Sequence, residues 1–276
     1  MYAGFNLTFS EDFFRRISNQ PSERYHHYAR IGKGTLQRIS NQKLDDYINR
    51  FFNNNTILDA NHIQEDWFPC IDADVFISHS HDDKYLVEAL AGWLYEDMGV
   101  SVFIDSDVWG YADDLLEQMN SKYSNKRMIG TGYVYDYKKC NKVAQHVNIM
   151  LLMSIQKMID NVESVFFLNT ENSVNAISGN QISSTYSPWI YSEILCSEII
   201  RKRNKGEYRS GGYLNEDSSL IHYQTQPIIV KYDLDLDHLI DIDEYVLYKW
   251  RENYIENGSR HSNALDCLYE IVSSRR

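Results

Sequence analysis

The chain has 276 residues, enough for one large domain or for one domain with an appendage. With 43% hydrophobic and 13% aromatic residues, it can bury a sizeable core. The formal net charge of −12 argues against broad electrostatic binding of nucleic acid, because an acidic surface repels phosphate groups. A small anionic ligand in a local pocket stays compatible with this charge.

The cysteine spacing indicates a reducing compartment, and the apolar runs argue against a membrane span. Cys70, Cys140, Cys196 and Cys267 lie far apart without a CxxC pair, which fits neither a zinc pattern nor a dense disulfide framework. The start MYAGFNLTFSEDFF has no basic residues followed by an apolar region, and no apolar run reaches the roughly 18 residues that a membrane span needs. We therefore expect a soluble, cytoplasmic protein with free thiols and no membrane partner.

Residues 1–70 are predicted to form an N-terminal helical extension. Ser10 is a candidate cap before an amphipathic start, and apolar residues recur near helical spacing at Leu36, Ile39, Leu44, Tyr47, Ile48 and Phe51. The segment RIGKGTLQR at 30–38 lacks the spacing of a phosphate loop and is interpreted as a turn. Pro69 ends this block, which leaves residues 71–276 as the second domain.

Strands and helices alternate from residue 74 onward. Apolar, β-rich runs predict strands over 75–77, 100–105, 163–170 and 226–234. Helical spacing predicts helices over 84–99, 140–160, 187–203 and 262–273, and the segment 106–120 is interpreted as a loop that opens another helix. The stretch 173–187 is predicted to be a loop, and the acidic run 233–244 a solvated surface. This alternation is typical of an α/β fold with a parallel sheet covered by helices on both faces.

Ligands of parallel sheets bind at the carboxyl ends of the strands, so the residues that follow each strand are the informative ones. Residues 78–80 follow the first predicted strand, and residues 105–110 follow the second. The loop after the third strand leads to the helix that opens at Ser187. These three segments are expected to converge on one crevice.

Two of these segments resemble the TIR family, the Toll/interleukin-receptor module. DVFISHSHDD (74–83), followed by a helix and GVSVFID (99–105), is similar to the opening of a TIR domain. SPWIYSEIL (187–195) is similar to the later TIR segment in which a serine, a tryptophan and a helical glutamate stand together. The resemblance covers about residues 71–275, in the family's order, and implies a flavodoxin-like fold.

The resemblance also implies an activity, because many TIR domains cleave NAD⁺ at the nicotinamide–ribose bond. Glu193 would be the catalytic glutamate, with Ser187 and Trp189 beside it. The residues that would line the same pocket are Ser78, His79, Ser80, Asp105 and Asp107. NAD⁺ would be a substrate, so no resident cofactor is expected.

A stand-alone chain of this kind resembles the signal-producing component of bacterial antiphage systems such as Thoeris. There the TIR protein makes a cyclic ADP-ribose messenger, and a separate effector protein reads it. Self-association through TIR–TIR contacts is also implied, since many TIR enzymes complete their site by assembly. The chain departs from the family in three places: the loop 105–113 lacks a basic residue found in some NAD-cleaving relatives, the stretch 120–163 is longer than in compact TIR domains, and the block 1–70 is additional.

The chemistry of NAD⁺ cleavage suits a single carboxylate. Glycosidases use two carboxyl groups, one of which protonates the leaving oxygen. Nicotinamide is already cationic and leaves neutral, so one carboxylate beside the developing oxocarbenium ion suffices. Trp189 and Glu193 are four residues apart and would share a helix face, whereas Glu198 would lie well round the helix.

A metal at SHSHDD is the weaker interpretation of that segment. His79 and His81 would share a face of an extended strand, but the strand ends there and no third ligand is placed by the sequence. Asp82 or Asp83 more simply caps the following helix, so we expect no metal.

Two other functions remain open. A non-catalytic TIR scaffold would act through TIR–TIR contacts, with the loop 105–114 and Trp109 as a contact surface. An enzyme similar to nucleoside deoxyribosyltransferases would use a glutamate on the glycosidic bond of deoxynucleosides and would ignore NAD⁺.

Overall fold

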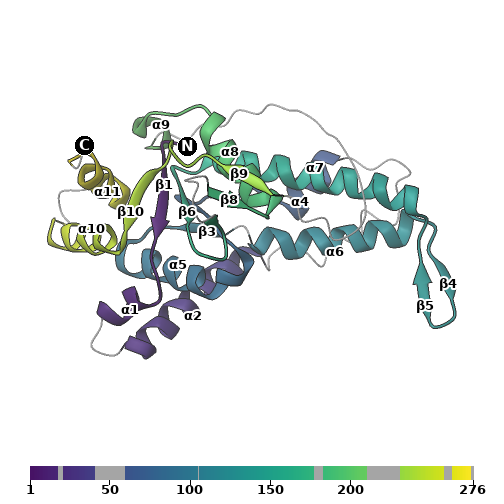
Figure 1. Ribbon diagram of the computed structural model, residues 1–276, viewed down its shortest axis with the longest axis horizontal. Coiled ribbons are helices and arrows are strands. Elements are labelled where there is room, and N and C mark those ends of the chain that lie inside the picture. The colour runs from purple at the N-terminus through teal and green to yellow at the C-terminus, as the bar shows by residue number, and fades with distance from the viewer. Residues whose placement is uncertain are drawn as a thin grey trace.

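Five strands form a central parallel sheet in the computed structural model, which describes residues 1–17, 21–40, 60–104, 106–176, 183–209, 231–257 and 263–274 (Figure 1). The spatial order is β10-β1-β6-β2-β3, and every neighbouring pair is parallel. The strands are β1 (Ala3–Thr8), β2 (Val75–Ser78), β3 (Val102–Ile104), β6 (Ser164–Leu168) and β10 (Ile240–Asp243). The predicted α/β class, with a parallel sheet flanked by helices, is confirmed.

Alternate residues of the strands enter two cores, one on each face of the sheet. Ile77 and Phe166 belong to the first core, and Phe76 and Val165 to the second. Period-two alternation causes this division, because successive strand side chains point to opposite faces. Both faces are covered, which explains why these strands are continuous apolar runs in the sequence.

Helices from distant parts of the chain cover each face. The first core is closed by α1 (Asp12–Arg16), α2 (Pro21–Ser40), α5 (Lys84–Met98), α10 (Glu244–Asn257) and α11 (Ala264–Ser273). The second face is covered by α4 (Ala60–Trp67), α6 (Ser106–Tyr123), α7 (Tyr137–Asn161) and α8 (Pro188–Ile199). The short helices η1 (His81–Asp83) and α9 (Lys205–Arg209) lie in connections.

The first strand contradicts the expected helical extension over residues 1–70. β1 lies inside the sheet, paired with β10 on one side and β6 on the other. Its alternate residues Ala3, Phe5 and Leu7 are buried in the first core. The helical prediction holds for α1, α2 and α4, and residues 41–59 lie outside the described residues. The N-terminal block therefore contributes a strand to the sheet.

The segment interpreted as a turn at residues 30–38 is part of helix α2. Its Gly32 lies against Gly92 of α5, where the two helices approach backbone to backbone. A Cβ atom built on Gly32 would stand 1.9 Å from the backbone oxygen of Glu88, and one on Gly92 would stand 1.9 Å from that of Tyr28. Glycine is needed here for the close packing of two helices.

Three expectations about the C-terminal half are corrected by the structure. Within the expected loop 173–187, the short strands β7 (Asn175–Ala176) and β8 (Ser183–Thr185) pair with each other, and β8 also pairs with β9 (Tyr232–Leu234), in a separate antiparallel sheet. The expected strand 226–234 thus joins this small sheet, and its residues 226–230 lie outside the described part. The acidic run supplies β10 instead, because Ile242 enters the core while Asp241 and Asp243 remain exposed.

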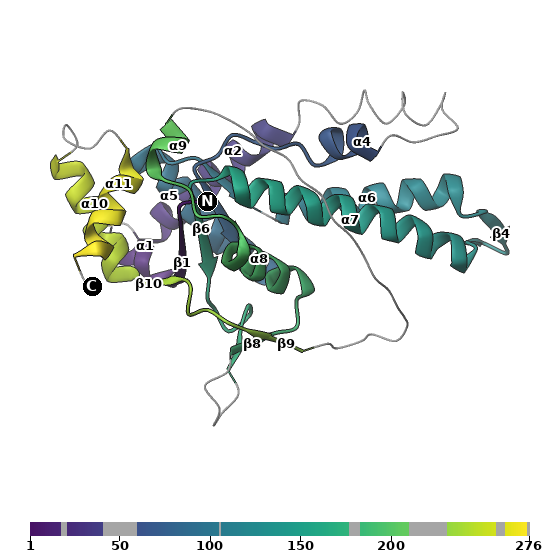
Figure 2. The same cartoon turned by 90° about the horizontal axis from the view of Figure 1, so that it is seen from above.

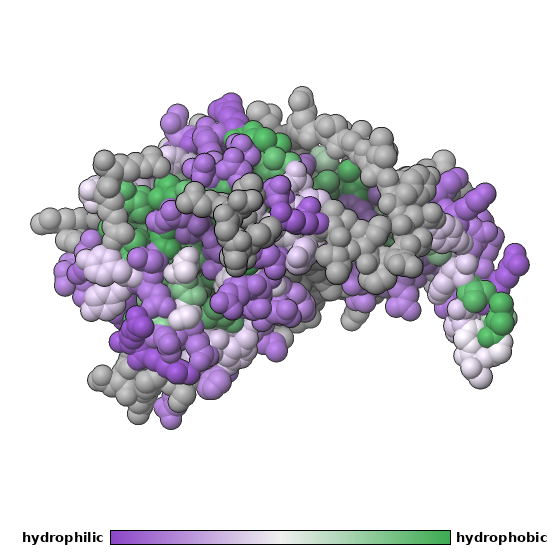
Figure 3. Space-filling model, viewed as in Figure 1, coloured by the Kyte–Doolittle hydropathy of each residue, from purple (hydrophilic) through white to green (hydrophobic). Residues whose placement is uncertain are grey.

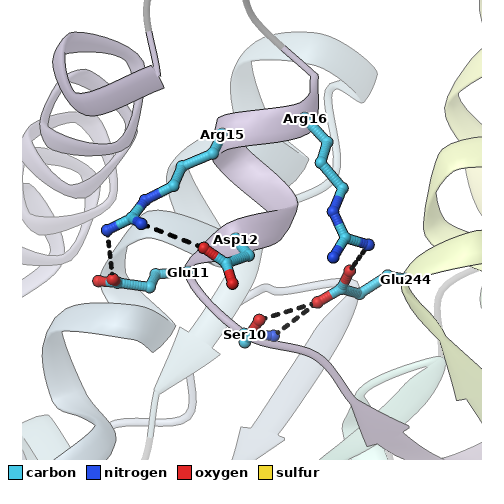
Figure 4. A network of polar contacts seen from close by, with 6 residues as sticks. All are labelled: Ser10, Glu11, Asp12, Arg15, Arg16 and Glu244. Carbon is cyan, nitrogen blue, oxygen red and sulfur yellow. Dashed lines mark hydrogen bonds and ion pairs between the residues drawn. The ribbon is translucent and has the colours of Figure 1, made fainter.

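A polar network holds the carboxyl end of β1 against the start of α10 (Figure 4). One carboxylate oxygen of Glu244 accepts hydrogen bonds from the backbone N–H and the hydroxyl of Ser10, at 3.1 and 2.9 Å. Its other oxygen is 2.9 Å from the guanidinium of Arg16. These contacts join the segment that follows β1 to the helix that follows β10.

The long stretch 120–163 forms most of a helical arm. Helices α6 and α7 run side by side away from the sheet, as both views show (Figures 1 and 2). A two-stranded hairpin, β4 (Arg127–Ile129) and β5 (Gly132–Val134), joins them at the far end. The segment TGYVYDYKKCNK (131–142) is therefore the second half of this hairpin and the beginning of α7.

Candidate functional site

Helix α8 begins at the serine and proline of SPWIYSEIL. The hydroxyl of Ser187 accepts the backbone N–H of Ile190 at 3.2 Å, and Pro188 occupies the first turn. The Ser187 side chain thus caps the helix. This cap fixes the start of the helix that carries Glu193 to the carboxyl end of the sheet.

Glu193 lies at the carboxyl end of β2. Its carboxylate oxygen Oε2 accepts a hydrogen bond of 2.6 Å from the hydroxyl of Ser78, the last residue of that strand. Both residues have no exposed surface. A buried carboxylate is costly unless hydrogen bonds replace its water, and Ser78 supplies one of them. The structure brings together these two predicted residues, which are 115 positions apart.

The other acidic residue of this helix provides a contrast. Glu198 is exposed, as expected for a residue well round the helix from Glu193. Trp189 is half-buried and packs against the second core. Trp189 therefore has a packing role that the sequence did not specify.

The residues after β2 take different environments. His79 is buried, with Nδ1 3.4 Å from the carbonyl oxygen of Ile77, whereas His81 is exposed in η1. The carbonyl oxygen of half-buried Ser80 accepts the backbone N–H of Asp83 at 2.9 Å. The two imidazoles do not share a strand face. Among the residues that the structure describes, no group of three or more His, Cys, Asp or Glu side chains is arranged to hold a metal ion.

Asp82 or Asp83 was expected to cap a helix, and the side chain of Asp83 makes no capping bond to α5. Its carboxylate instead accepts hydrogen bonds from the hydroxyl of Thr170 at 2.5 Å and the amide of Asn172 at 2.7 Å. This bridge ties the loop after β2 to the loop after β6. Sequence reasoning missed Thr170 and Asn172, although their position at and just beyond the end of a predicted strand was the available signal.

The loop after β3 is described only in part. Asp105 lies outside the described residues. Asp107 is in the first turn of α6, and its side chain is likewise outside the described part of the chain. The structure therefore neither joins these two aspartates to Glu193 nor separates them from it.

Cys196, one turn after Glu193, is unsuited to nucleophilic chemistry. Burial, together with the negative charges of Glu193 and Asp160, raises the pKa of the Cys196 thiol to about 12. At neutral pH it therefore stays protonated, whereas the nucleophilic form of cysteine is the thiolate. Of the buried groups on α8, the carboxylate of Glu193 is the stronger candidate for chemistry.

Neither of two sizeable cavities in the described part of the chain is lined by Glu193 or Ser78. One of about 540 Å³ lies at the carboxyl ends of β1 and β6, between Phe9, Tyr25 and Thr170. The other, of about 570 Å³, lies between α4, α7 and the end of α8, where it is lined by Phe68, Lys157 and Cys196. Since Glu193 has no exposed surface, a ligand could contact its carboxylate only after a covering group had moved.

Comparisons of the chain with protein-family models, with curated proteins and with solved structures found no match. Within the described residues, no helix has both the length and the apolar character that crossing a bilayer requires.

Proposed function

We propose that this chain is a TIR-type enzyme that cleaves NAD⁺ at the nicotinamide–ribose bond, with Glu193 as the catalytic carboxylate. The released ADP-ribose part is hydrolysed or cyclised into a signal. In the wider form of this proposal, the enzyme works in the bacterial cytoplasm during antiphage defence, associates through TIR–TIR contacts, and sends its product to a separate effector protein.

The observation that carries the proposal is the burial of Glu193 at the carboxyl end of a parallel strand. Its side chain has no exposed surface and accepts a hydrogen bond from the hydroxyl of Ser78, with 2.6 Å between the two oxygens. Most helical glutamates are solvated, as Glu198 is on the same helix. A desolvated carboxylate in this position matches the place where parallel sheets bind their ligands.

The order of the strands also supports a flavodoxin-like TIR domain. In flavodoxin-like sheets, the strands stand in the order 2-1-3-4-5. When the strands are numbered along the chain from β2, the neighbours β3-β2-β6 stand in the order 2-1-3, as in that sheet. Strand β10 lies at the opposite edge, in the fifth place of the sheet. The fourth place is taken by the N-terminal strand β1. The proposed domain would therefore include residues from before position 71.

The proposed reaction needs one negative charge near the ribose. The bond between the ribose C1′ and the nicotinamide nitrogen breaks, and its electron pair leaves with nicotinamide, which becomes neutral. The carboxylate of Glu193 stabilises the oxocarbenium-like ribose that remains. In a site that excludes water, this attraction is stronger than in bulk solvent. Attack on C1′ by water gives ADP-ribose, and attack by a nucleophile within the ADP-ribose part gives a cyclic product.

The test compares two glutamates of one helix. The parent chain, Glu193→Gln and Glu198→Gln are incubated with NAD⁺ at low and high protein concentration, and products are separated by chromatography with mass detection. The proposal expects nicotinamide release by the parent and by Glu198→Gln, with at least a hundredfold loss in Glu193→Gln. The mass of the second product distinguishes hydrolysis from cyclisation.

Other outcomes decide against the proposal. Equal release by Glu193→Gln would mean that another group carries the reaction. Absence of release at every concentration would favour a TIR scaffold. Cleavage of deoxynucleosides in place of NAD⁺ would favour a deoxyribosyltransferase-like enzyme.

A further inference from the structure

The hairpin at the end of the arm carries four exposed large hydrophobic residues. Met128 and Ile129 of β4 are 69% and 65% exposed, and Tyr133 and Val134 of β5 are 59% and 42% exposed. Figure 3 shows this apolar group at the far end of the arm. Isolated exposed apolar residues are ordinary, but four on one small hairpin, Met128 and Tyr133 on one face and Ile129 and Val134 on the other, make both faces of the tip available for contact.

The hairpin is held in a defined shape. Its strands pair Met128 with Tyr133 and Ile129 with Gly132, and Gly130 adopts a positive φ of 62° in the turn. The ammonium group of Lys126 lies 4.3 Å from the centre of the Tyr133 ring, which holds the base of the hairpin. A preorganised apolar surface loses little conformational entropy when it binds.

The charge around the hairpin is opposite to that of the rest of the chain. The segment 121–142 contains a single carboxylate, Asp136, and six cations: Lys122, Lys126, Arg127, Lys138, Lys139 and Lys142. Its net charge is therefore +5, and the other residues of this −12 chain together carry −17. All six cations are exposed, and Asp136 uses its carboxylate to cap α7 at the backbone N–H of Lys139.

We propose that the arm tip, defined as residues 126–139, docks onto the acidic body of a second copy of this chain. The arm carries its tip away from its own body in both views, so the contact joins two molecules (Figures 1 and 2). Two tips would repel each other because both are basic. The acidic body supplies the complementary charge and is present at the same concentration as the tip.

This contact is head-to-tail, because the tip of one copy meets a different surface of the next. It builds rings or longer assemblies in place of a symmetric dimer. The inference does not depend on NAD⁺ cleavage, and it assigns a role to the long stretch 120–163.

The test measures self-association of the full chain by sedimentation velocity. The parent is compared with Lys126→Glu/Arg127→Glu and with Met128→Ser/Ile129→Ser. Arg30→Glu/Lys33→Glu on α2 makes the same charge change at exposed cations elsewhere, and Ile199→Ser removes an exposed apolar residue of α8. We expect concentration-dependent assembly of the parent and of both controls, and at least a tenfold weaker association of both tip variants.

Salt and mixing provide two further readouts. The Debye length falls from about 10 Å at 0.1 M salt to about 3 Å at 1 M, so association of the parent should weaken strongly over this range. A labelled tip variant still has an acidic body and should bind the parent's tip, whereas it should not bind itself. This mixing result distinguishes a head-to-tail contact from a symmetric one.

Several results would overturn the inference. A parent that stays monomeric at about 100 μM in 0.1 M salt, or tip variants that associate as the parent does, would remove its basis. Failure of the labelled tip variant to bind the parent would exclude the acidic body as the docking surface. Tip-dependent binding of a monomeric parent to phosphatidylserine vesicles would assign the tip to an anionic lipid surface instead.

Discussion

The hydroxyl of Ser78 and the carboxylate of Glu193 meet inside the protein, where water does not replace a lost hydrogen bond. In Ser78→Ala, the carboxylate loses this donor. We expect the free energy of unfolding to fall by roughly 1–3 kcal/mol, the usual effect of leaving a buried polar group unsatisfied. Urea unfolding at pH 7 measures the change.

Ser80→Ala is the matched control for Ser78→Ala. Ser80 lies two residues further along the chain and is half-buried, and its backbone carbonyl, which the substitution keeps, accepts the hydrogen bond from Asp83. It should change the free energy of unfolding by less than about 0.5 kcal/mol. Equal effects of the two substitutions would show that the bond to Glu193 contributes nothing specific.

His238 is predicted to make stability depend on pH. Its Nε2 is 2.8 Å from the hydroxyl of Ser197, and burial, aided by the charge of Lys202, lowers the pKa of His238 below its ordinary value of 6.5. The unfolded chain therefore binds a proton more tightly than the folded one. The contribution is present above pH 6.5 and is lost as the pH falls toward the folded pKa.

The measurement is the melting temperature of the parent, His238→Gln and His81→Gln from pH 7.5 to pH 5. His238→Gln should lose less stability across this range than the parent does, because it has no imidazole to protonate. His81 is exposed, so His81→Gln should follow the parent. Identical curves for all three proteins would contradict the assignment to His238.

At the scale of elements, the crossing of α2 and α5 depends on a missing side chain. A Cβ atom at position 32 would stand 1.9 Å from a backbone oxygen of α5, and neither helix can relieve this contact by a rotamer change. Gly32→Ala should destabilise the protein by roughly 3 kcal/mol, at the upper end of the usual effect of overpacking, because backbone atoms must move.

Gly34 lies on the same helix, and a Cβ atom added there would have nothing within 4 Å, so Gly34→Ala is the control. It should be neutral or stabilise the protein by about 0.5–1 kcal/mol, since alanine favours the helix. Thermal unfolding of both variants measures the difference. A Gly32→Ala protein as stable as Gly34→Ala would mean that the two helices do not approach this closely.

At the scale of the whole molecule, we expect residues 1–70 to be needed for folding. Deleting them removes β1 from between β10 and β6, which leaves two unpaired strand edges and an open first core. We expect the truncated chain 71–276 to be insoluble or to lack a cooperative unfolding transition. Replacing residues 127–134 by two glycines should retain the parent's circular dichroism and melting behaviour, because the hairpin lies at the end of the arm. A well-folded truncated chain would contradict the place of β1 in the sheet.

The strands were predictable to the extent that their signal is local. β2, β3 and β6 are buried on both faces and appear as apolar runs between helical patterns. In β1 and β10 the signal is a short alternation, AGFNLT and IDID, with polar residues between the apolar ones. Their partners lie far away in the chain, so pairing decides them, and pairing is not visible in a window of a few residues.

The candidate site divides in the same way. The motif SPWIYSEIL, its capping serine and the outward direction of Glu198 follow from helix geometry and could be predicted. The burial of Glu193, the bond from Ser78 and the bridge from Asp83 to Thr170 and Asn172 could not, because they depend on where α8 and two loops settle on the sheet.

The sequence by itself determined the α/β class and the positions of most helices, because alternation and helical spacing act over a few residues, whereas the choice of Glu193 rested on the resemblance of SPWIYSEIL to a TIR segment. Only the tertiary structure showed that the N-terminal strand completes the sheet and that helices α2 and α5 pack closely at Gly32 and Gly92. Only the tertiary structure also showed that residues 120–163 extend into an arm with a basic, apolar tip. These features arise from contacts between segments far apart in the chain, and the free energy of such contacts depends on the packing of the whole molecule.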